Sequence, residues 1–155
     1  VIDPKQEDCI YPFKELCGAA VAYKVVEALF EAFGRDAEDV DYLMENVAIA
    51  TVGDVMDLVG ENRIFVKQGL EMLKRTKNLG LKALIECTGV DVERLSAYHI
   101  GFIIGPCLNA SGRLDTAKRA LELLSSKTRK EADILEQLTD KNYWPYPTYS
   151  DLLFY

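Results

Sequence analysis

A single carboxylate, Asp54, directly follows an unbroken run of small and β-branched residues at 47–52. Such a run is typical of a strand that is buried on both faces. Groups that follow the carboxyl ends of strands in an α/β protein face the ligand crevice, where a carboxylate can hold a hard divalent cation. Alternatively, Asp54 caps the next turn, and spacing alone favours this cap. Asp57 is expected to be a cap or a surface group.

A second polar group lies in the segment 105–113, which reads Gly-Pro-Cys-Leu-Asn-Ala-Ser-Gly-Arg. Proline and glycine are expected to break the helix here and leave a loop. The loop carries an amide, a hydroxyl, free backbone N–H groups and a guanidinium, on Asn109, Ser111, Gly112 and Arg113. Because a helix is expected to start near Asp115, these groups suit a phosphate. The alternative is a structural turn in which Arg113 pairs with a carboxylate, and the pattern alone does not decide.

A third polar cluster is Gly60-Glu61-Asn62-Arg63. Asn62 is expected to cap the helix that begins there. Arg63 could pair with an acidic group or with a phosphate, and a structural role is favoured for both residues. The single histidine, His99, lies in an apolar segment and is expected to be a hydrogen-bonded packing residue.

Helical periodicity dominates the elements that must position these groups. Apolar residues at three- and four-residue steps predict a first helix that ends at Gly34 and a helix closed by Gly89. The same pattern predicts helices over 38–44, from near Asn62 and over 117–124. Thr128 to Glu131 has capping-box spacing and predicts a last helix. The predicted fold is mostly α with one or few β-strands, as part of an α/β domain.

The composition limits the classes of function. The chain has 155 residues with a formal charge of −7, and 49% are hydrophobic against 28% charged, which indicates one globular domain. The negative charge argues against broad capture of a polyanion, although a local basic loop could still contact one. No apolar run approaches the roughly 20 residues of a membrane span. Four cysteines without a C-x-x-C pair are typical of a reducing, cytoplasmic location.

Both ends of the sequence are unusual. Val1-Ile2-Asp3-Pro4 has neither an initiator methionine nor a signal peptide, so we expect a segment of a longer protein. The last stretch, 143–155, holds six of the fifteen aromatic residues and two prolines. The prolines forbid continuation of the preceding helix, and the aromatic tail is expected to fold back or to meet a partner.

Four motif blocks, in this order, resemble the DHH phosphoesterase family and, within it, single-strand-specific exonucleases. The resemblance covers residues 1 to 142, and the ordered combination is far more specific than any one block. The blocks are Tyr11-Pro12-Phe13-Lys14-Glu15-Leu16-Cys17-Gly18, Ala50-Thr51-Val52-Gly53-Asp54-Val55, Gly60-Glu61-Asn62-Arg63 and Gly105-Pro106-Cys107-Leu108-Asn109-Ala110-Ser111-Gly112-Arg113-Leu114. From the first block we also expect that Gly18 begins a helix and permits close packing.

This resemblance implies 5′→3′ hydrolysis of single-stranded DNA by two divalent ions, Mn²⁺ or Mg²⁺. It makes Asp54 a metal ligand and catalytic residue, and it places 109–113 against the DNA backbone. Position 107 often carries arginine in the family, whereas this chain has Cys107. The implied organisation is 1–58 as the end of the catalytic domain, 59–142 as connecting helices with the DNA-contact loop, and 143–155 as a tail outside the family pattern.

The chain lacks other parts of the family pattern. The family's Asp-x-Asp pair, the next Asp and the Asp-His-His signature, which normally precede the segment that starts here, are absent, and so is the Gly-Gly-His substrate domain that normally follows. We therefore expect the isolated chain to be inactive. The alternative function is a non-catalytic helical module that binds DNA or associates with itself through exposed apolar faces and the aromatic tail.

Overall fold

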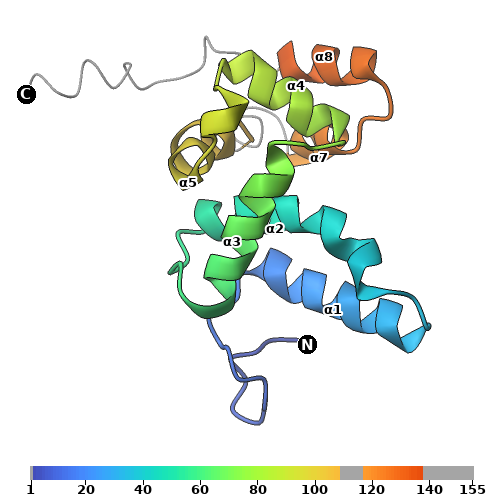
Figure 1. Cartoon of the computed structure of the whole chain (residues 1–155), viewed down its shortest axis with the longest axis vertical. Coiled ribbons are helices and arrows are strands. Elements are labelled where there is room, and N and C mark those ends of the chain that lie inside the picture. Colours follow the sequence, from blue (N-terminus) through green and yellow to red (C-terminus); the bar gives the residue numbers. More distant parts are fainter. Residues whose placement is uncertain (1, 109–116, 138–155) are drawn as a thin grey trace, which may run out of the picture.

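The computed structural model describes residues 2–108 and 117–137, and its elements are helices (Figure 1). In chain order they are α1 (Gly18–Ala32), the 3₁₀-helix η1 (Ala37–Leu43), α2 (Met44–Gly53), α3 (Gly60–Leu73), α4 (Leu79–Thr88), the 3₁₀-helix η2 (Val92–Arg94), α5 (Ala97–His99), the π-helix η3 (Ile100–Ile104), α7 (Ala117–Leu124) and α8 (Arg129–Gln137). The prediction of a mostly helical fold is confirmed. None of the helices in these two ranges is long and apolar enough to cross a membrane.

The strand expected at 47–52 is wrong, because these residues form most of helix α2. No residue of α2 before Gly53 is exposed: six are buried, among them Val47, Ala48, Ile49 and Thr51, and the other three are half-buried. A helix buried in this way shows no apolar stripe of period 3.6, so its sequence looks like that of a buried strand. No strand occurs in the parts of the chain that the structure describes.

Helix α2 lies between two hydrophobic clusters. One cluster packs α1, η1 and α3 around α2, and in it the rings of Tyr23 and Phe65 meet edge to face at 5.6 Å. The other joins α4, η3, α7 and α8 to the Ile49 side of α2. In Figure 1, α1 lies on one side of α2 and α3, and the group of α4, α7 and α8 lies on the other. The pair α2–α3 therefore forms the middle layer of the molecule.

Several helix boundaries follow the sequence signals. Gly34 has a φ of +67°, and Gly89 ends α4 in the left-handed region at +68°. The Oγ1 atom of Thr128 accepts a hydrogen bond from the backbone N–H of Glu131, whose carboxylate accepts from the N–H of Thr128, so the capping box is confirmed. These signals are local, which is why they could be seen in the sequence.

The helix break expected at Gly105 and Pro106 is wrong, because residues 105–108 are helical. Pro106 cannot donate a backbone hydrogen bond within a helix. The turn directly before it is the π-helix η3, in which the i→i−4 ladder is already interrupted. The chain therefore passes Pro106 without leaving the helical path.

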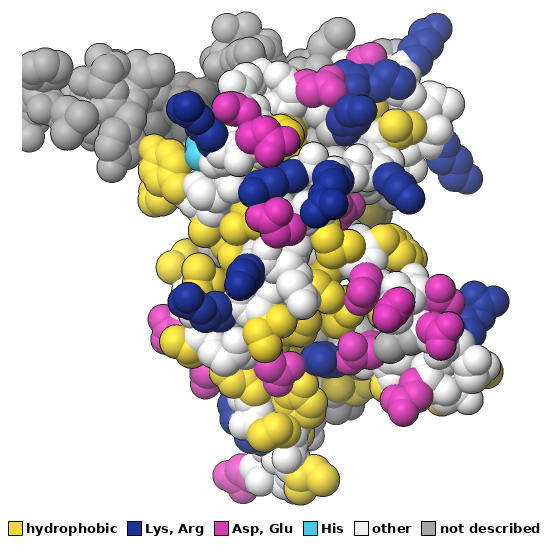
Figure 2. Space-filling model, viewed as in Figure 1, with side chains coloured by type: hydrophobic (Ala, Val, Ile, Leu, Met, Phe, Trp, Pro, Cys, Tyr) yellow, Lys and Arg dark blue, Asp and Glu magenta, His cyan; other side chains and the backbone are white. Residues whose placement is uncertain are grey.

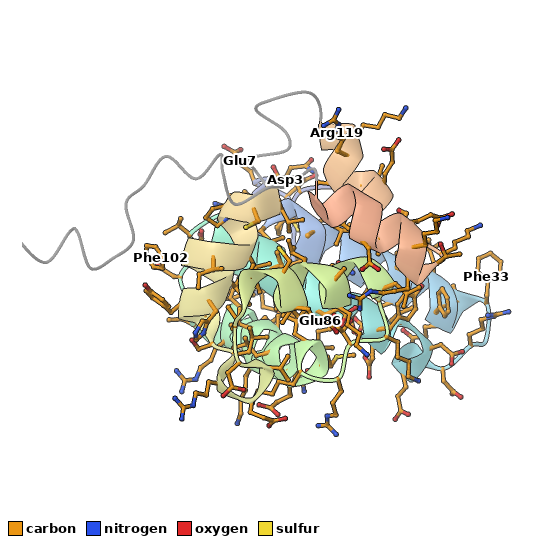
Figure 3. The ribbon with its side chains drawn as sticks, turned by 90° about the horizontal axis from the view of Figure 1, so that it is seen from above. Asp3, Glu7, Phe33, Glu86, Phe102 and Arg119 are labelled. Atoms are coloured by element: carbon orange, nitrogen blue, oxygen red, sulfur yellow. The ribbon has the colours of Figure 1, made fainter. Side chains whose placement is uncertain are left out.

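Charge is distributed unevenly over the surface. Figure 2 shows acidic side chains gathered over η1 and the end of α1, and Lys and Arg side chains over α3 and the segment that leads into α4. At the α4–α8 contact, Glu86 pairs with Arg129 at 2.6 Å, and Glu86 is labelled on α4 in Figure 3.

Helices α2 and α3 approach closely at Gly69. An added Cβ on Gly69 would clash with the Cβ of Ala48 and would lie 2.7 Å from the carbonyl oxygen of Met44. Gly18 does begin α1, but an added Cβ there would meet no atom within 4 Å. The expectation of close packing at Gly18 is therefore wrong, whereas the α2–α3 contact requires the glycine at Gly69.

We expect Gly69→Ala to lower the free energy of unfolding by about 2 kcal/mol, because overpacking between α2 and α3 exceeds the roughly 1 kcal/mol gained in helix propensity. Urea unfolding followed by circular dichroism measures this change. Gly18→Ala is the matched control and should stay within about 0.5 kcal/mol of the original chain. Equal stability of the two variants would contradict the close α2–α3 contact.

Candidate metal-ligand site and its supports

Asp54 is exposed and lies at the C-terminal end of α2, not at the exit of a strand. Its backbone N–H donates to the carbonyl of Ala50 at 2.8 Å, whereas its carboxylate makes no hydrogen bond or ion pair with another described residue. The side chain therefore caps no helix in this part of the chain. Because the carbonyl end of a helix also carries partial negative charge, the α2 terminus and Asp54 together favour a cation.

The turn after Asp54 holds an uncommon backbone conformation. Val55 has a φ of +55°, a region that β-branched residues rarely adopt. The N–H of Val55 donates to the carbonyl of Val52 and the N–H of Met56 donates to that of Thr51, both at 3.1 Å. These two bonds form a Schellman motif, in which glycine usually occupies the position of Val55. The site therefore stores backbone strain directly beside Asp54.

Asn62 fastens the loop that follows this turn. Its side chain is fully buried, and its Nδ2 donates to the carbonyl oxygens of Glu15 at 2.7 Å and of Asp57 at 3.0 Å. The amide thus joins three segments: α3, the loop after α2 and the segment before α1. The expectation that Asn62 caps its helix is wrong, because α3 begins at Gly60 and its N-cap residue is Val59. The Oδ1 of Asn62 has no hydrogen-bond partner among the described residues.

Two further contacts join the motif blocks. The hydroxyl of Tyr11 donates to the carboxylate of Glu61 at 2.8 Å, and the ring of Phe13 lies against Gly60, whose φ is +49°. A Cβ at Gly60 would lie 2.7 Å from the Phe13 ring, so this position requires glycine. Burial, and then the hydrogen bond to Glu61, raise the pKa of Tyr11. The first and third blocks are therefore packed on each other.

The second block is tied to the first from inside the core. The Sγ of Cys17 lies 3.4 Å from the Oγ1 of Thr51, and both side chains are buried. Thr51 precedes Asp54 by three residues on α2. The first three blocks, which are far apart in the sequence, thus surround the end of α2.

The structure describes some of the remaining predicted site residues and not others. Arg63 is exposed, and its guanidinium makes no hydrogen bond or ion pair with another described residue. His99 accepts or donates through Nδ1 at 2.8 Å from the hydroxyl of Ser96, as expected for a hydrogen-bonded packing residue. The DNA-contact residues of the fourth block lie outside the described residues; they are Asn109, Ser111, Gly112 and Arg113.

The donor chemistry of Asp54 fits a hard divalent ion, which prefers carboxylate oxygens. Over 2–108 and 117–137, no group of three or more His, Cys, Asp or Glu side chains is arranged to hold a metal. Asp54 therefore offers one ligand, and a complete site requires ligands from elsewhere.

The comparisons with known proteins agree with this arrangement. No family model matches the chain. The chain is 41% identical over 141 residues to the single-stranded-DNA-specific exonuclease RecJ of Bacillus subtilis, covering 91% of this chain and 17% of that protein. It is 36% identical over 151 residues to RecJ of Escherichia coli, covering 90% and 26%. The chain thus spans about a sixth to a quarter of the length of these relatives.

Solved structures show the same likeness. RecJ of Thermus thermophilus in complex with Mn²⁺ matches with a TM-score of 0.75 at 32% identity, over 86% of this chain and 19% of that chain. A structure of exonuclease RecJ bound to manganese matches with a TM-score of 0.75 at 33% identity, over 84% and 33%. Fold and sequence together relate the chain to the single-stranded-DNA-specific exonucleases. Within that class, the chain is similar to a segment of RecJ, and the resemblance seen in the motif blocks is confirmed.

Sequence reasoning missed the supports of the site. The contacts Tyr11–Glu61 and Asn62–Glu15 join residues 50 and 47 positions apart, and no local pattern indicates them. The left-handed Val55 was also unexpected, because a valine gives no signal for that conformation.

We expect Asn62→Ala to lower the free energy of unfolding by about 3 kcal/mol, because two carbonyl oxygens lose their buried donor. The adjacent exposed residue supplies the control, and Arg63→Ala should change stability by less than about 0.5 kcal/mol. Both are measured by urea unfolding. A loss below about 1 kcal/mol for Asn62→Ala, the usual net worth of a single hydrogen bond, would show that the three segments are held by other contacts.

Val55→Gly is expected to raise the free energy of unfolding by about 1 kcal/mol, because glycine relieves the left-handed strain at a modest cost in chain entropy. Gly89→Ala is the converse control: its φ is +68° and an added Cβ meets nothing, so only strain is introduced and stability should fall by about 1 kcal/mol. Thermal unfolding of both variants measures whether each substitution raises or lowers the stability. If the Val55→Gly chain is less stable than the original, the backbone at Val55 is not strained.

Proposed function

We propose that the chain is a segment of a 5′→3′ single-stranded-DNA exonuclease that hydrolyses phosphodiester bonds with Mn²⁺ or Mg²⁺. The observation that carries this proposal is Asp54: the residue matched to an acidic motif of the family is exposed, unpartnered among the described residues and held in a fixed turn. The relatives named as single-stranded-DNA-specific exonucleases, and the solved structures that contain Mn²⁺ or Mg²⁺, support it.

Asp54 would hold one metal ion together with ligands from outside this chain. When bound, a pair of such ions activates water and stabilises the attacking and leaving oxygens of an in-line displacement. The Schellman turn at Val55 and the Asn62 amide fix the backbone that carries Asp54. We further propose that the fourth block contacts the DNA backbone through Asn109, Ser111, Gly112 and Arg113, and that Arg63 meets a phosphate near the end of α2.

The proposal includes the place of the segment in the longer enzyme. Residues 1–58 would end the catalytic domain, 59–142 would connect it onward, and 143–155 would be a tail outside the family pattern. The enzyme would act in the cytoplasm, in DNA repair or recombination. Because one carboxylate cannot build a two-metal site, the isolated chain would be inactive.

In the full-length exonuclease, Asp54→Asn is expected to lower kcat by about 10³-fold or more, because the substitution removes a charged ligand while it keeps the side-chain shape. Release of nucleotides from a 5′-labelled single strand in Mn²⁺ measures the rate. Asp57→Asn, three residues further along in the same loop, is the control and should retain activity. Equal rates for the two variants would remove Asp54 from the metal site.

Self-association is the second candidate, and one groove favours it. The groove has a volume of about 820 Å³ between the N-terminal segment and α1, and its apolar lining includes Ile2, Val25 and Leu29. The exposed rings of Phe33 and Phe102 lie at opposite edges of the molecule in Figure 3, so they do not join the groove in one continuous apolar face. Sedimentation of the original chain at high concentration tests this association. If the original chain associates, the Leu29→Glu chain should be monomeric. A monomeric original chain would exclude this candidate.

A further inference from the structure

A group of cations, most of them outside any ion pair, lies along α3 and continues into α4. Residues 1–62 contain fourteen Asp and Glu against four Lys and Arg, whereas 63–82 contain six Lys and Arg and one acidic residue, Glu71. Although the whole chain is negatively charged, the segment 63–82 is therefore positively charged. We name these six cations the α3–α4 basic surface; they are Arg63, Lys67, Lys74, Arg75, Lys77 and Lys82.

The pairing of these cations differs from that of many others on the molecule. Glu71 pairs with Lys74 at 2.8 Å. The other five are exposed, and none of their side-chain charges makes a hydrogen bond or ion pair with another described residue. By contrast, Lys24 and Arg129 each contact two carboxylates. The basic surface therefore keeps most of its charge available for a partner.

Three of the six cations are also aligned along α3. With 3.6 residues per turn, Arg63, Lys67 and Lys74 lie within about 40° of one another around α3 and extend along about 16 Å of its axis. Figure 2 shows Lys and Arg side chains over α3 and the segment leading into α4, on one face of the molecule. A line of separated positive charges matches a polymer with regularly spaced negative charges better than it matches a single small anion.

We propose that the α3–α4 basic surface binds the sugar–phosphate backbone of a nucleic-acid strand. The line begins at Arg63, in the first turn of α3, directly after the loop that Asn62 fastens to the Asp54 turn. A strand with one phosphate near Asp54 would therefore find further cations along α3. The identity of the polymer as single-stranded DNA rests on the proposed function, whereas the polyanion-binding surface rests on the charges themselves.

The test measures binding of the 155-residue chain to a fluorescein-labelled oligo-dT of about 20 nucleotides, long enough to span several phosphate contacts, by anisotropy at several salt concentrations and in EDTA. The test variant changes Lys67, Arg75 and Lys77 to glutamine. The matched control also removes three exposed positive charges, by changing Arg35, Lys127 and Lys130 to glutamine. Both variants keep Asp54 and Arg63, and EDTA prevents metal-dependent cleavage, so failure here is distinguishable from failure of the exonuclease proposal.

We expect the test variant to bind at least about tenfold more weakly at low salt. The slope of log K against log salt should decrease by about 2, because each lost contact to a single strand contributes about 0.7. The control should keep both affinity and slope. An original chain that binds no oligonucleotide at low salt, or equal losses in the two variants, would overturn the proposal.

An acidic protein surface is the competing occupant, since residues 1–62 of a second copy carry the complementary charge. Sedimentation of the original chain and of the test variant at the same salt concentrations separates the two. If the original chain forms salt-sensitive dimers that the test variant does not form, and oligo-dT does not dissociate them, the surface binds protein and the nucleic-acid proposal is overturned.

Discussion

The arrangement around Asp54 depends on one buried amide. The two N–H groups of Asn62 are shared between a carbonyl that precedes α1 and a carbonyl in the loop after α2. Buried carbonyls without a donor are costly, so this side chain fixes three segments relative to one another. The packing of Phe13 on Gly60 and the Tyr11–Glu61 hydrogen bond act in the same place. Several motif residues thus hold together the backbone segments around Asp54.

The same region combines rigidity with strain. Gly69 brings α3 so close to α2 that no side chain fits between them, and the α2 helix is buried on nearly all sides. This rigid pair ends in a turn in which Val55 adopts a conformation that valine rarely accepts. Strain of this kind persists only where surrounding contacts enforce it. Its position next to an exposed, unpartnered carboxylate is the pattern expected where a ligand is to be bound.

Electrostatics divides the molecule differently from packing. The hydrophobic clusters meet at α2 and α3, whereas the change from acidic to basic surface falls within the first turn of α3. The end of α2 and Asp54 favour a cation, and the exposed face of α3 favours an anion. Such neighbouring regions of opposite sign suit the metal ion and the phosphate backbone that we propose as partners.

Features that depend on local interactions could be predicted from the order of the amino acids. The glycine at Gly89, the capping box at Thr128 and the ordered motif blocks were sufficient to predict helix ends and the relationship to an exonuclease family. Three other features required the folded chain: 47–52 is a helix, Asn62 is a buried tie instead of a cap, and the chain stays helical through Pro106. In each case the deciding interaction lies outside the local pattern: burial or half-burial of α2 from Met44 to Val52, carbonyls 47 and 5 positions away from Asn62, and the π-helical turn η3 before Pro106.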